Sequence, residues 1–286
     1  MVVGASLHAL PPGAALVDLL GDDGERLADA GDRAVADPAG VFPLDEVRLR
    51  APLSPPTFRD HYAFEEHAHW GRQSRGLEMD TAWYELPVFY FSNPYAIGGP
   101  GDEVAMPPDC LQLDFELEVA AVVGMEGRDL SADQAERHIA GYCVLNDWSA
   151  RDVQRREMGL NLGPHKGKDF ATTIGPFLVT PDELAGRRKH KGYDLAMTAT
   201  VNGRLYSQGN WSDIAFSFAE FLAYDSRCTK VGVGDLIGSG TCGTGCILEL
   251  AGRFGGDRYP WLQPGDEVEL WVEELGTLRN RVGVRG

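Results

Sequence analysis

The stretch L-D-F-E-L-E-V-A-A-V-V-G, residues 113–124, alternates between two kinds of side chain. Its odd-numbered positions are apolar, whereas its even-numbered positions begin with the acids Asp114, Glu116 and Glu118 and continue with small or apolar residues. In a β-strand, side chains two residues apart share one face at a spacing of ~6.6 Å. The alternation therefore predicts a strand with one face in a core and with the acids on a face that becomes buried beyond Glu118.

The three acids on this face favour one of two interpretations. Carboxylates that enter a partly buried region repel each other unless a cation neutralises them. Clustered carboxylate oxygens are the ligands that hard divalent ions such as Mg²⁺ and Ca²⁺ prefer. A row of charges is more often a solvated face, however, so the strand alone leaves both a metal site and a plain surface open.

A second acidic cluster, N-D-W-S-A-R-D-V-Q at residues 146–154, follows a strand-like apolar run. Its Asp147 would lie at the end of that strand, where sites are often placed on rigid scaffolds. Ser149 and Asp152 have the spacing of a capping box, which predicts that a helical turn begins there. On such a turn two polar residues three positions apart share a face: Arg151 and Gln154.

A third cluster, F-R-D-H-Y-A-F-E-E-H-A-H-W at residues 58–70, contains three histidines among nine residues: His61, His67 and His69. This density suggests zinc at first sight. The spacing matches no His-Glu-x-x-His helix, and no cysteine pair accompanies it. Taken singly, each histidine is more often an ordinary core or surface residue than a ligand or base.

Composition limits the function classes. The 286 residues include 26 basic and 43 acidic ones, for a formal charge of −17, and 43% are hydrophobic. Such a chain fits one large globular domain or a domain with a small appendage, and its surplus acid argues against a nucleic-acid partner. No apolar stretch approaches the ~20 residues that cross a bilayer, so we expect no membrane partner. An odd number of scattered cysteines and no signal-peptide pattern predict a cytoplasmic protein with reduced thiols.

The proline-rich A-P-L-S-P-P at residues 51–56 marks the predicted boundary within the chain. Proline fixes the backbone and removes hydrogen-bond donors, so this stretch is typical of a rigid connector. We therefore divide the chain into a small N-terminal segment with its connector, residues 1–56, and a main body, residues 57–286.

The main body contains more strand patterns than helix patterns. Asn202-Gly203 lies between two alternating runs and predicts a two-residue hairpin, because both turn positions need positive φ. Residues 268–272 predict another strand after a Pro-Gly turn. Ser212 or Asp213 is expected to cap a helix with one apolar face, formed by Ile214, Phe218, Phe221 and Leu222. Strands and helices do not alternate regularly, which disfavours a doubly wound parallel sheet.

Six short motifs follow one another along residues 57–286. They are F-R-D-H-Y-A-F-E-E-H from Phe58, P-V-F-Y-F-S-N-P from Pro87, E-L-E from Glu116, N-D-W-S-A-R-D-V-Q from Asn146, G-K-D-F with T-T-I-G-P-F from Gly167, and G-S-G-T with L-E-L from Gly238. Each is weak alone, but in this order they resemble the fumarylacetoacetate hydrolase family. The resemblance implies an α+β, predominantly β fold: a mixed β-sandwich roll with short helices.

The resemblance also assigns roles to individual residues. The family's metal carboxylates fall on Asp60, Glu116, Glu118 and Asp147. Its water-activating histidine falls on His67, the carboxylate partner of that histidine on Glu249, and further catalytic groups on Lys168, Gln154 and Arg151. Substrate-side or ion-side positions fall on Tyr62, Tyr90, Arg75 and Thr241.

Three positions depart from the family pattern. A substrate tyrosine falls near Met158, Trp70 stands where smaller members have a carboxylate, and the substrate arginine aligns with either Arg72 or Arg75. These departures concern the substrate and leave the predicted metal ligands in place.

The resemblance implies hydrolysis of a C–C bond in a 1,3-diketone, such as a 2,4-dioxo acid, an acylpyruvate or a fumarylacetoacetate-like compound. Water activated by His67 would attack the distal carbonyl, and a metal-stabilised enolate would leave. The implied cofactor is a divalent cation, Mg²⁺ first and Ca²⁺ or Mn²⁺ as alternatives, and the expected assembly is a homodimer. On the same scaffold, decarboxylation, tautomerisation, hydration or isomerisation of oxo acids is the alternative.

Two other classes of protein are alternatives to an enzyme of this family. Residues 238–243 spell G-x-G-x-x-G, the dinucleotide fingerprint, but residues 244–250 are expected to form a strand where that fingerprint requires a helix. A zinc-stabilised binding protein could use Cys228, Cys242 and Cys246 with a histidine, although C-x₃-C lacks a second pair.

Overall fold

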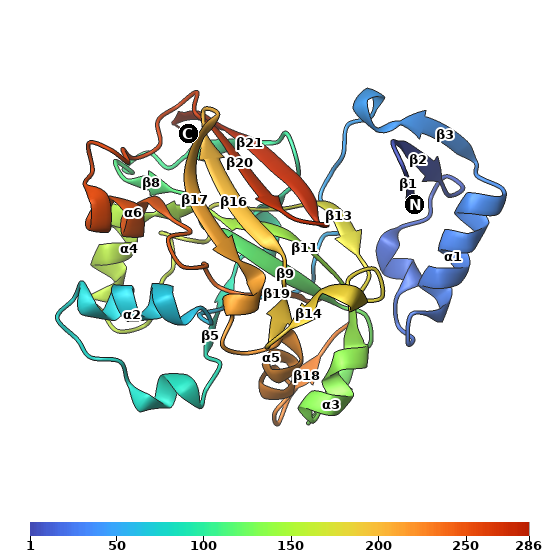
Figure 1. Cartoon of the computed structure of the whole chain (residues 1–286), viewed down its shortest axis with the longest axis horizontal. Coiled ribbons are helices and arrows are strands. Elements are labelled where there is room, and N and C mark those ends of the chain that lie inside the picture. Colours follow the sequence, from blue (N-terminus) through green and yellow to red (C-terminus); the bar gives the residue numbers. More distant parts are fainter. Residues whose placement is uncertain (286) are drawn as a thin grey trace.

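The computed structural model describes residues 1–285, and its largest element is a mixed seven-stranded sheet (Figure 1). β19 runs parallel to β4 and antiparallel to β9, so neighbouring strands come from distant parts of the chain. In spatial order the strands are β5 (Phe89–Ser92), β4 (Phe58–His61), β19 (Leu236–Gly238), β9 (Leu117–Val123), β11 (Ile139–Asp147), β13 (Thr172–Val179) and β6 (Ile97–Gly98).

A second sheet of five strands packs across the first and encloses the larger apolar core with it. Its strands are β17 (Arg204–Asn210), β16 (Ala196–Val201), β20 (Glu267–Val272), β21 (Gly276–Arg285) and β7 (Glu103–Met106). Asn202 and Gly203 join β16 to β17 with φ of 50° and 74°, which confirms the predicted hairpin. β20 alternates buried and half-buried residues, as predicted for 268–272.

Strand β9 lies between two cores, which explains its alternation. Leu117 and Val119 point into the larger core, whereas Ala120 and Val122 point into a smaller one on the opposite face. The acidic face therefore does become buried beyond Glu118, as predicted. The strand is not continuous, however: Leu113–Asp114 forms the separate β8, which pairs with β12 (Ser149–Ala150).

Short helices occupy the ends and edges of the sheets. They are α1 (Glu25–Ala36), α2 (Glu65–Gln73), α3 (Ala132–Ala135), α4 (Arg151–Met158), α5 (Phe218–Asp225) and α6 (Ile247–Phe254). None of the helices within residues 1–285 has the length and apolar character needed to cross a bilayer. The fold is α+β and predominantly β, as expected.

The caps predicted for two helices are wrong, although both helices are present. Helix α5 is capped by Ser217, whose side chain forms a capping box with Glu220, so Ser212 and Asp213 lie before the helix. Its predicted apolar residues inside the helix are buried nonetheless. Helix α4 begins at Arg151 without a side-chain cap, because the Ser149 hydroxyl donates to the Asp147 carbonyl instead.

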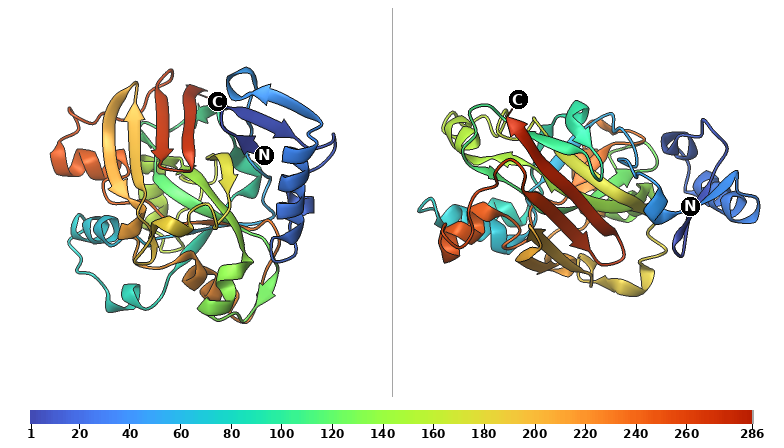
Figure 2. Two further views of the ribbon diagram at one scale, coloured as in Figure 1. Left: turned by 45° about the vertical axis from the view of Figure 1, so that its right-hand side comes forward. Right: turned by 90° about the horizontal axis from the view of Figure 1, so that it is seen from above.

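The first fifty residues form a small unit beside the main body (Figure 2). Strands β1 (Val2–Val3), β2 (Ser6–Ala9) and β3 (Gly40–Pro43) make a three-stranded sheet next to α1. The Gly21 amide donates to the Gly124 carbonyl of the main body at 2.6 Å. Residues 51–56 contain neither helix nor strand.

Candidate active site

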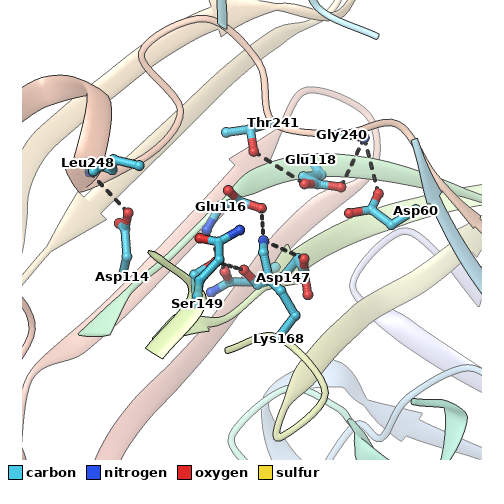
Figure 3. A network of polar contacts seen from close by, with 12 residues as sticks. Asp60, Asp114, Glu116, Glu118, Asp147, Ser149, Lys168, Gly240, Thr241 and Leu248 are labelled. Carbon is cyan, nitrogen blue, oxygen red and sulfur yellow. Dashed lines mark hydrogen bonds and ion pairs between the residues drawn. The ribbon is translucent and has the colours of Figure 1, made fainter. Parts of the chain in front are cut away.

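Four acidic side chains from distant parts of the chain converge at one place in the large sheet (Figure 3). Asp60 belongs to β4, Glu118 to β9 and Asp147 to the end of β11, while Glu116 directly precedes β9. One oxygen from each residue lies within 4.8 Å of the others, and all four side chains are buried. The sheet order brings them together, because β4, β19, β9 and β11 are successive neighbours.

The strand between β4 and β9 leaves room for these carboxylates. Gly238 of β19 pairs with Asp60 on one side and Ala120 on the other. A Cβ atom at position 238 would lie 2.3 Å from an Asp60 carboxylate oxygen. Glycine is therefore required here to let Asp60 reach the cluster.

One side of the cluster has no cationic partner. Within residues 1–285, no ion pair forms to Asp60 or Glu118; both accept the Gly240 amide, at 3.2 and 3.1 Å, and Thr241 donates to Glu118 at 3.4 Å. Burial, reinforced by the neighbouring carboxylates, raises the pKa of Asp60 to about 8 and the pKa of Glu118 well above its ordinary value. These carboxylates need positive charge to remain ionised together.

The other side of the cluster is compensated by two buried cations. Arg151 donates to Glu116 at 2.7 Å, and Lys168 contacts both Glu116 and, at 2.6 Å, Asp147. Burial by itself would raise the pKa of Glu116, but Lys168 and Arg151 outweigh it and hold this pKa below its ordinary value. Burial nevertheless raises the pKa of Asp147, despite its contact with Lys168.

The Tyr90 hydroxyl lies between the two sides. It is 3.1 Å from Asp60 and also contacts Asp147. Burial and the adjacent carboxylates raise the pKa of Tyr90 well above its ordinary value, so the phenol remains a neutral donor. It orients both carboxylates without adding charge.

Asp114 lies apart from the other four acids, as Figure 3 shows, and is a structural residue. Its carboxylate accepts Arg151 at 2.8 Å and the backbone amides of Ile247 and Leu248 at 2.6 and 3.0 Å. It therefore holds Arg151 beside Glu116 and fixes the first turn of α6. This position satisfies helix-terminal amides that would otherwise be unpaired.

Next to the cluster, His67 of α2 and Glu249 of α6 form a buried pair. The His67 Nδ1 atom lies 2.8 Å from Glu249, whose side chain is fully buried. The expected strand over 244–250 is wrong: helix α6 places Glu249 inward, toward α2. Tyr62 packs edge-on against the His67 ring at 5.7 Å, and burial raises the pKa of Tyr62 to about 12.

The donor set fits a hard divalent cation. All four groups are carboxylates, and those on the uncompensated side carry raised pKa values that a bound cation would lower. Oxygen-only sites suit Mg²⁺, Ca²⁺ or Mn²⁺ rather than softer metals. The residues that would hold the ion are Asp60, Glu116, Glu118 and Asp147.

Comparison with known proteins agrees with this geometry. The model of the family described as "Fumarylacetoacetate (FAA) hydrolase C-terminal" matches residues 57–283. The chain belongs to the fumarylacetoacetate hydrolase family.

Relatives within the family differ in their reactions. Human mitochondrial oxaloacetate tautomerase FAHD2A is 31% identical over 264 residues, covering 91% of this chain and 77% of the human protein. The 2,4-didehydro-3-deoxy-L-rhamnonate hydrolase of a Sphingomonas strain is 33% identical, covering 77% and 70% of the two chains. The structure of fumarylacetoacetate hydrolase from Exiguobacterium antarcticum has a TM-score of 0.69 and 30% identity, covering 86% of this chain and 81% of that one. The family is an enzyme family, and hydrolysis is one of its reactions.

Other residues that the family resemblance singled out surround the carboxylate cluster and differ in how exposed they are. Gln154 accepts Arg151 at 3.0 Å, which confirms that the two residues share a helix face. Arg75 is exposed beyond the end of α2, where it donates to the Gly71 carbonyl at 2.8 Å. Met158 is the last residue of α4 and is partly exposed. The substrate roles of these residues stay predictions.

Neither a dinucleotide-binding protein nor a zinc-stabilised binding protein matches the geometry of the site. A helix does follow G-x-G-x-x-G, contrary to expectation, but the Gly240 amide in that loop is directed at Asp60 and Glu118. A phosphate would meet carboxylates there. Among residues 1–285, Cys228 and Cys242 belong to no group that could hold a metal.

Beside the His67–Glu249 pair lie Arg253, which sequence reasoning missed, and Cys246, which it named only as a ligand in the zinc alternative. One guanidinium nitrogen of Arg253 lies 2.5 Å from Glu249, and another lies 2.8 Å from Glu66. Cys246 precedes α6 and contributes its sulfur to a group with His67 and Glu116. A helical reading of residues 247–254 would have shown the first one, because Glu249 and Arg253 have the i, i+4 spacing.

Proposed function

We propose that the chain is a cation-dependent hydrolase that cleaves a C–C bond in a 2,4-dioxo acid or a similar 1,3-diketone. The observation that carries this proposal is the buried His67–Glu249 pair, 2.8 Å between Nδ1 and the carboxylate, beside a cluster of four carboxylates. A histidine oriented by a carboxylate is the arrangement that activates water or a hydroxyl for attack on a carbonyl.

The carboxylate cluster determines where the substrate would bind. A divalent cation held there supplies positive charge that polarises and orients two adjacent substrate oxygens. A 2-oxo acid offers such a pair, in its carboxylate and its neighbouring keto oxygen. A cavity of about 210 Å³ opens beside Tyr90 and Lys168 and suits a small acyl group.

His67 is the proposed proton acceptor. Its Nδ1 atom is occupied by Glu249, so the other ring nitrogen is left to take a proton from water. A positioned base of this kind contributes about 10²–10⁴-fold to a rate. The same proton can later be returned to the carbon of the leaving enolate, so the step is balanced within the site.

Lys168 and Arg151 are the proposed stabilisers of the negative charge that develops on the attacked carbonyl. Both are buried beside Glu116, where water does not screen their charge. Removal of one such donor costs roughly 3–4 kcal/mol of transition-state stabilisation in comparable sites. Gln154 holds the Arg151 guanidinium from its outer side.

Tautomerisation of oxaloacetate-like acids is the second candidate. It is favoured by the reaction named for the human relative, and it needs only the enolisation half of the scheme above. His67 would then move a proton between carbon and oxygen, and no water would be added.

One experiment separates the two candidates. The Mg²⁺-loaded chain is incubated with acetylpyruvate and, separately, with the enol form of oxaloacetate. Hydrolysis yields acetate and pyruvate in equal amounts, whereas tautomerisation changes the ultraviolet absorbance without new acids. Absence of acetate at full cation loading contradicts the hydrolase proposal. We retain Mg²⁺, a homodimer and a cytoplasmic location as parts of the proposal.

A further inference from the structure

A second possible metal-binding group overlaps the site and has a different chemical character. His67, Glu116 and Cys246 each offer one ligand atom, and these atoms lie within 4.8 Å of one another. All three residues are buried. They come from α2, from the residue before β9 and from the residue before α6, and a β-bridge between Glu116 and Cys246 holds two of the three backbones together.

The surroundings of His67 are those of a metal-binding histidine. Its Nδ1 atom contacts the fully buried Glu249 at 2.8 Å, which fixes the ring and leaves the other nitrogen available. Histidines that bind metals almost always donate their second ring N–H to a carboxylate or carbonyl in this way. Arg151 donates to Glu116 at 2.7 Å and so orients its carboxylate.

The donor atoms of this group select a different ion from the four carboxylates. Sulfur, imidazole nitrogen and one carboxylate oxygen suit Zn²⁺, which binds tetrahedrally through three protein ligands and one open position. Mg²⁺ and Ca²⁺ avoid sulfur. Burial raises the pKa of the Cys246 thiol, and the positive charge of Arg151 acts in the opposite direction. A bound Zn²⁺ would displace the thiol proton to solvent.

We propose that His67, Glu116 and Cys246 form an inhibitory site for Zn²⁺ or a similarly soft divalent cation. Zn²⁺ there occupies the ring nitrogen that His67 needs as a proton acceptor. It also engages Glu116, which belongs to both groups, so the soft ion and the hard ion compete for one ligand. Inhibition, unlike binding, rests on the proposed function.

Binding is tested first, with Co²⁺ as a spectroscopic substitute for Zn²⁺ in the full-length, Mg²⁺-loaded chain. A thiolate ligand gives Co²⁺ an intense charge-transfer absorption that oxygen and nitrogen ligands do not give. We expect this band in the unmodified chain and in Cys228→Ser and Cys242→Ser, an exposed and a buried control. It should be absent in Cys246→Ser. A band that survives in Cys246→Ser, or that disappears only in Cys242→Ser, overturns the proposal.

Inhibition is tested by titrating Zn²⁺ into the Mg²⁺-loaded enzyme, with each variant compared with its own zinc-free rate. Loss of even an outer-shell partner costs about 10–100-fold in metal affinity, so Cys246→Ser should raise the half-inhibitory Zn²⁺ concentration at least tenfold. Equal sensitivity in the two chains contradicts the proposal. If Cys246→Ser is unfolded by circular dichroism, His67→Gln replaces it in the Co²⁺ measurement, where the charge-transfer band must weaken at least tenfold at equal Co²⁺.

The two proposals can fail separately. If neither acetylpyruvate nor oxaloacetate is converted, the proposed function fails, and the cobalt band still reports on the thiolate site. If substrate is converted but the band is absent from the unmodified chain, only the zinc site fails.

Discussion

The two sides of the carboxylate cluster differ in how their charge is balanced. On one side, Glu116 is paired with Arg151 and Lys168, and its pKa lies below the ordinary value. On the other side, within the described residues 1–285, Asp60 and Glu118 receive only a backbone amide and hydroxyl groups, and their pKa values are raised. All of these side chains are buried. Burial alone therefore does not explain the difference: Glu116 has two buried cations beside it, whereas Asp147, which contacts only Lys168, still has a raised pKa.

This asymmetry indicates which carboxylates have their charge balanced by the protein itself and which ones need positive charge from a bound ligand. The paired side is complete without any added group, because Asp114 and Glu116 together satisfy Arg151. The unpaired side holds buried carboxylates close together at a cost in stability that nothing in the described chain offsets. Such sites are candidates for function because the missing charge can be supplied from outside.

The largest expected effect comes from breaking the paired side. Glu116→Ala removes a proposed cation ligand and leaves Arg151 and Lys168 with fewer buried partners. Removal of one partner of a buried pair typically costs about 3–5 kcal/mol. We expect loss of turnover, loss of Mg²⁺ binding by isothermal titration calorimetry, and a lower free energy of unfolding in urea.

Glu118→Gln on the unpaired side is the matched comparison. It should also abolish Mg²⁺ binding and turnover, but the metal-free chain should be no less stable than the unmodified one, because Gln replaces a buried carboxyl group whose ionisation is disfavoured by burial and by its acidic neighbours. Equal destabilisation by the two substitutions would show that the difference between the two sides does not affect the free energy of unfolding.

The second prediction concerns His67, which lies beside the paired carboxylate without being one of the four carboxylates that could hold a hard cation. His67→Ala should lower kcat about 10²–10⁴-fold through loss of the base. Mg²⁺ affinity should stay within a few-fold, because the proposed ligands of the hard ion are all carboxylates. The two measurements are steady-state kinetics and calorimetry on one preparation. A parallel collapse of both would instead make His67 a ligand of the catalytic ion or a structural residue.

Much of the fold follows from local patterns. The alternation along β9 gave the correct buried faces because each face packs into its own core. Asn202-Gly203 gave the hairpin because positive φ at both positions is a local requirement. Helix α6 was predicted as a strand, since a short apolar run does not distinguish the two. Its first turn is fixed by Asp114, more than 130 residues away in the chain, which no local pattern contains.

Only part of the site could be predicted, because some of its features are local in the sequence and others depend on contacts between distant residues. The acids of β9 and Asp147 can be singled out from their own segments, but their convergence depends on sheet order. Strand β19 separates β4 from β9 and comes from near residue 236, so the position of Asp60 beside Glu118 is a property of the topology. The partner of Lys168 and the role of Gly238 are equally non-local.

The third prediction extends the comparison to Glu249, a buried carboxylate that does have a cation. Arg253 lies 2.5 Å from it and is partly exposed in a groove, so we expect it to position Glu249 and, through Glu249, His67. Arg253→Ala should lower kcat about tenfold with little change in KM. Arg253→Lys, or guanidinium added to Arg253→Ala, should restore part of the rate.

Two controls make the role of Arg253 specific. Arg258→Ala removes a neighbouring arginine that stacks on Tyr259, and it should have no effect on kcat. In a His67→Ala background, Arg253→Ala should add little further loss, because contacting residues that act together are not additive. Full additivity there would assign Arg253 to the stability of α6 alone.

The smallest expected effect is a pH dependence that comes from the unpaired side. The folded-state pKa of Asp60 is about 8, and that of Glu118 is also raised, whereas unfolded carboxyls titrate near 4. The folded state therefore binds protons more tightly, and the stability of the metal-free chain should fall as pH rises from about 4 to about 8. Glu116 titrates below this window and does not oppose the trend.

A bound cation removes the cost of ionising Asp60 and Glu118. The rise in Tm caused by Mg²⁺ should therefore grow between pH 5 and pH 8, by about 2–4 °C for each kcal/mol. Differential scanning calorimetry with and without Mg²⁺ measures this rise, and Glu118→Gln should flatten it. A rise in Tm that stays constant or shrinks over this range would mean that Asp60 and Glu118 are already ionised without the cation.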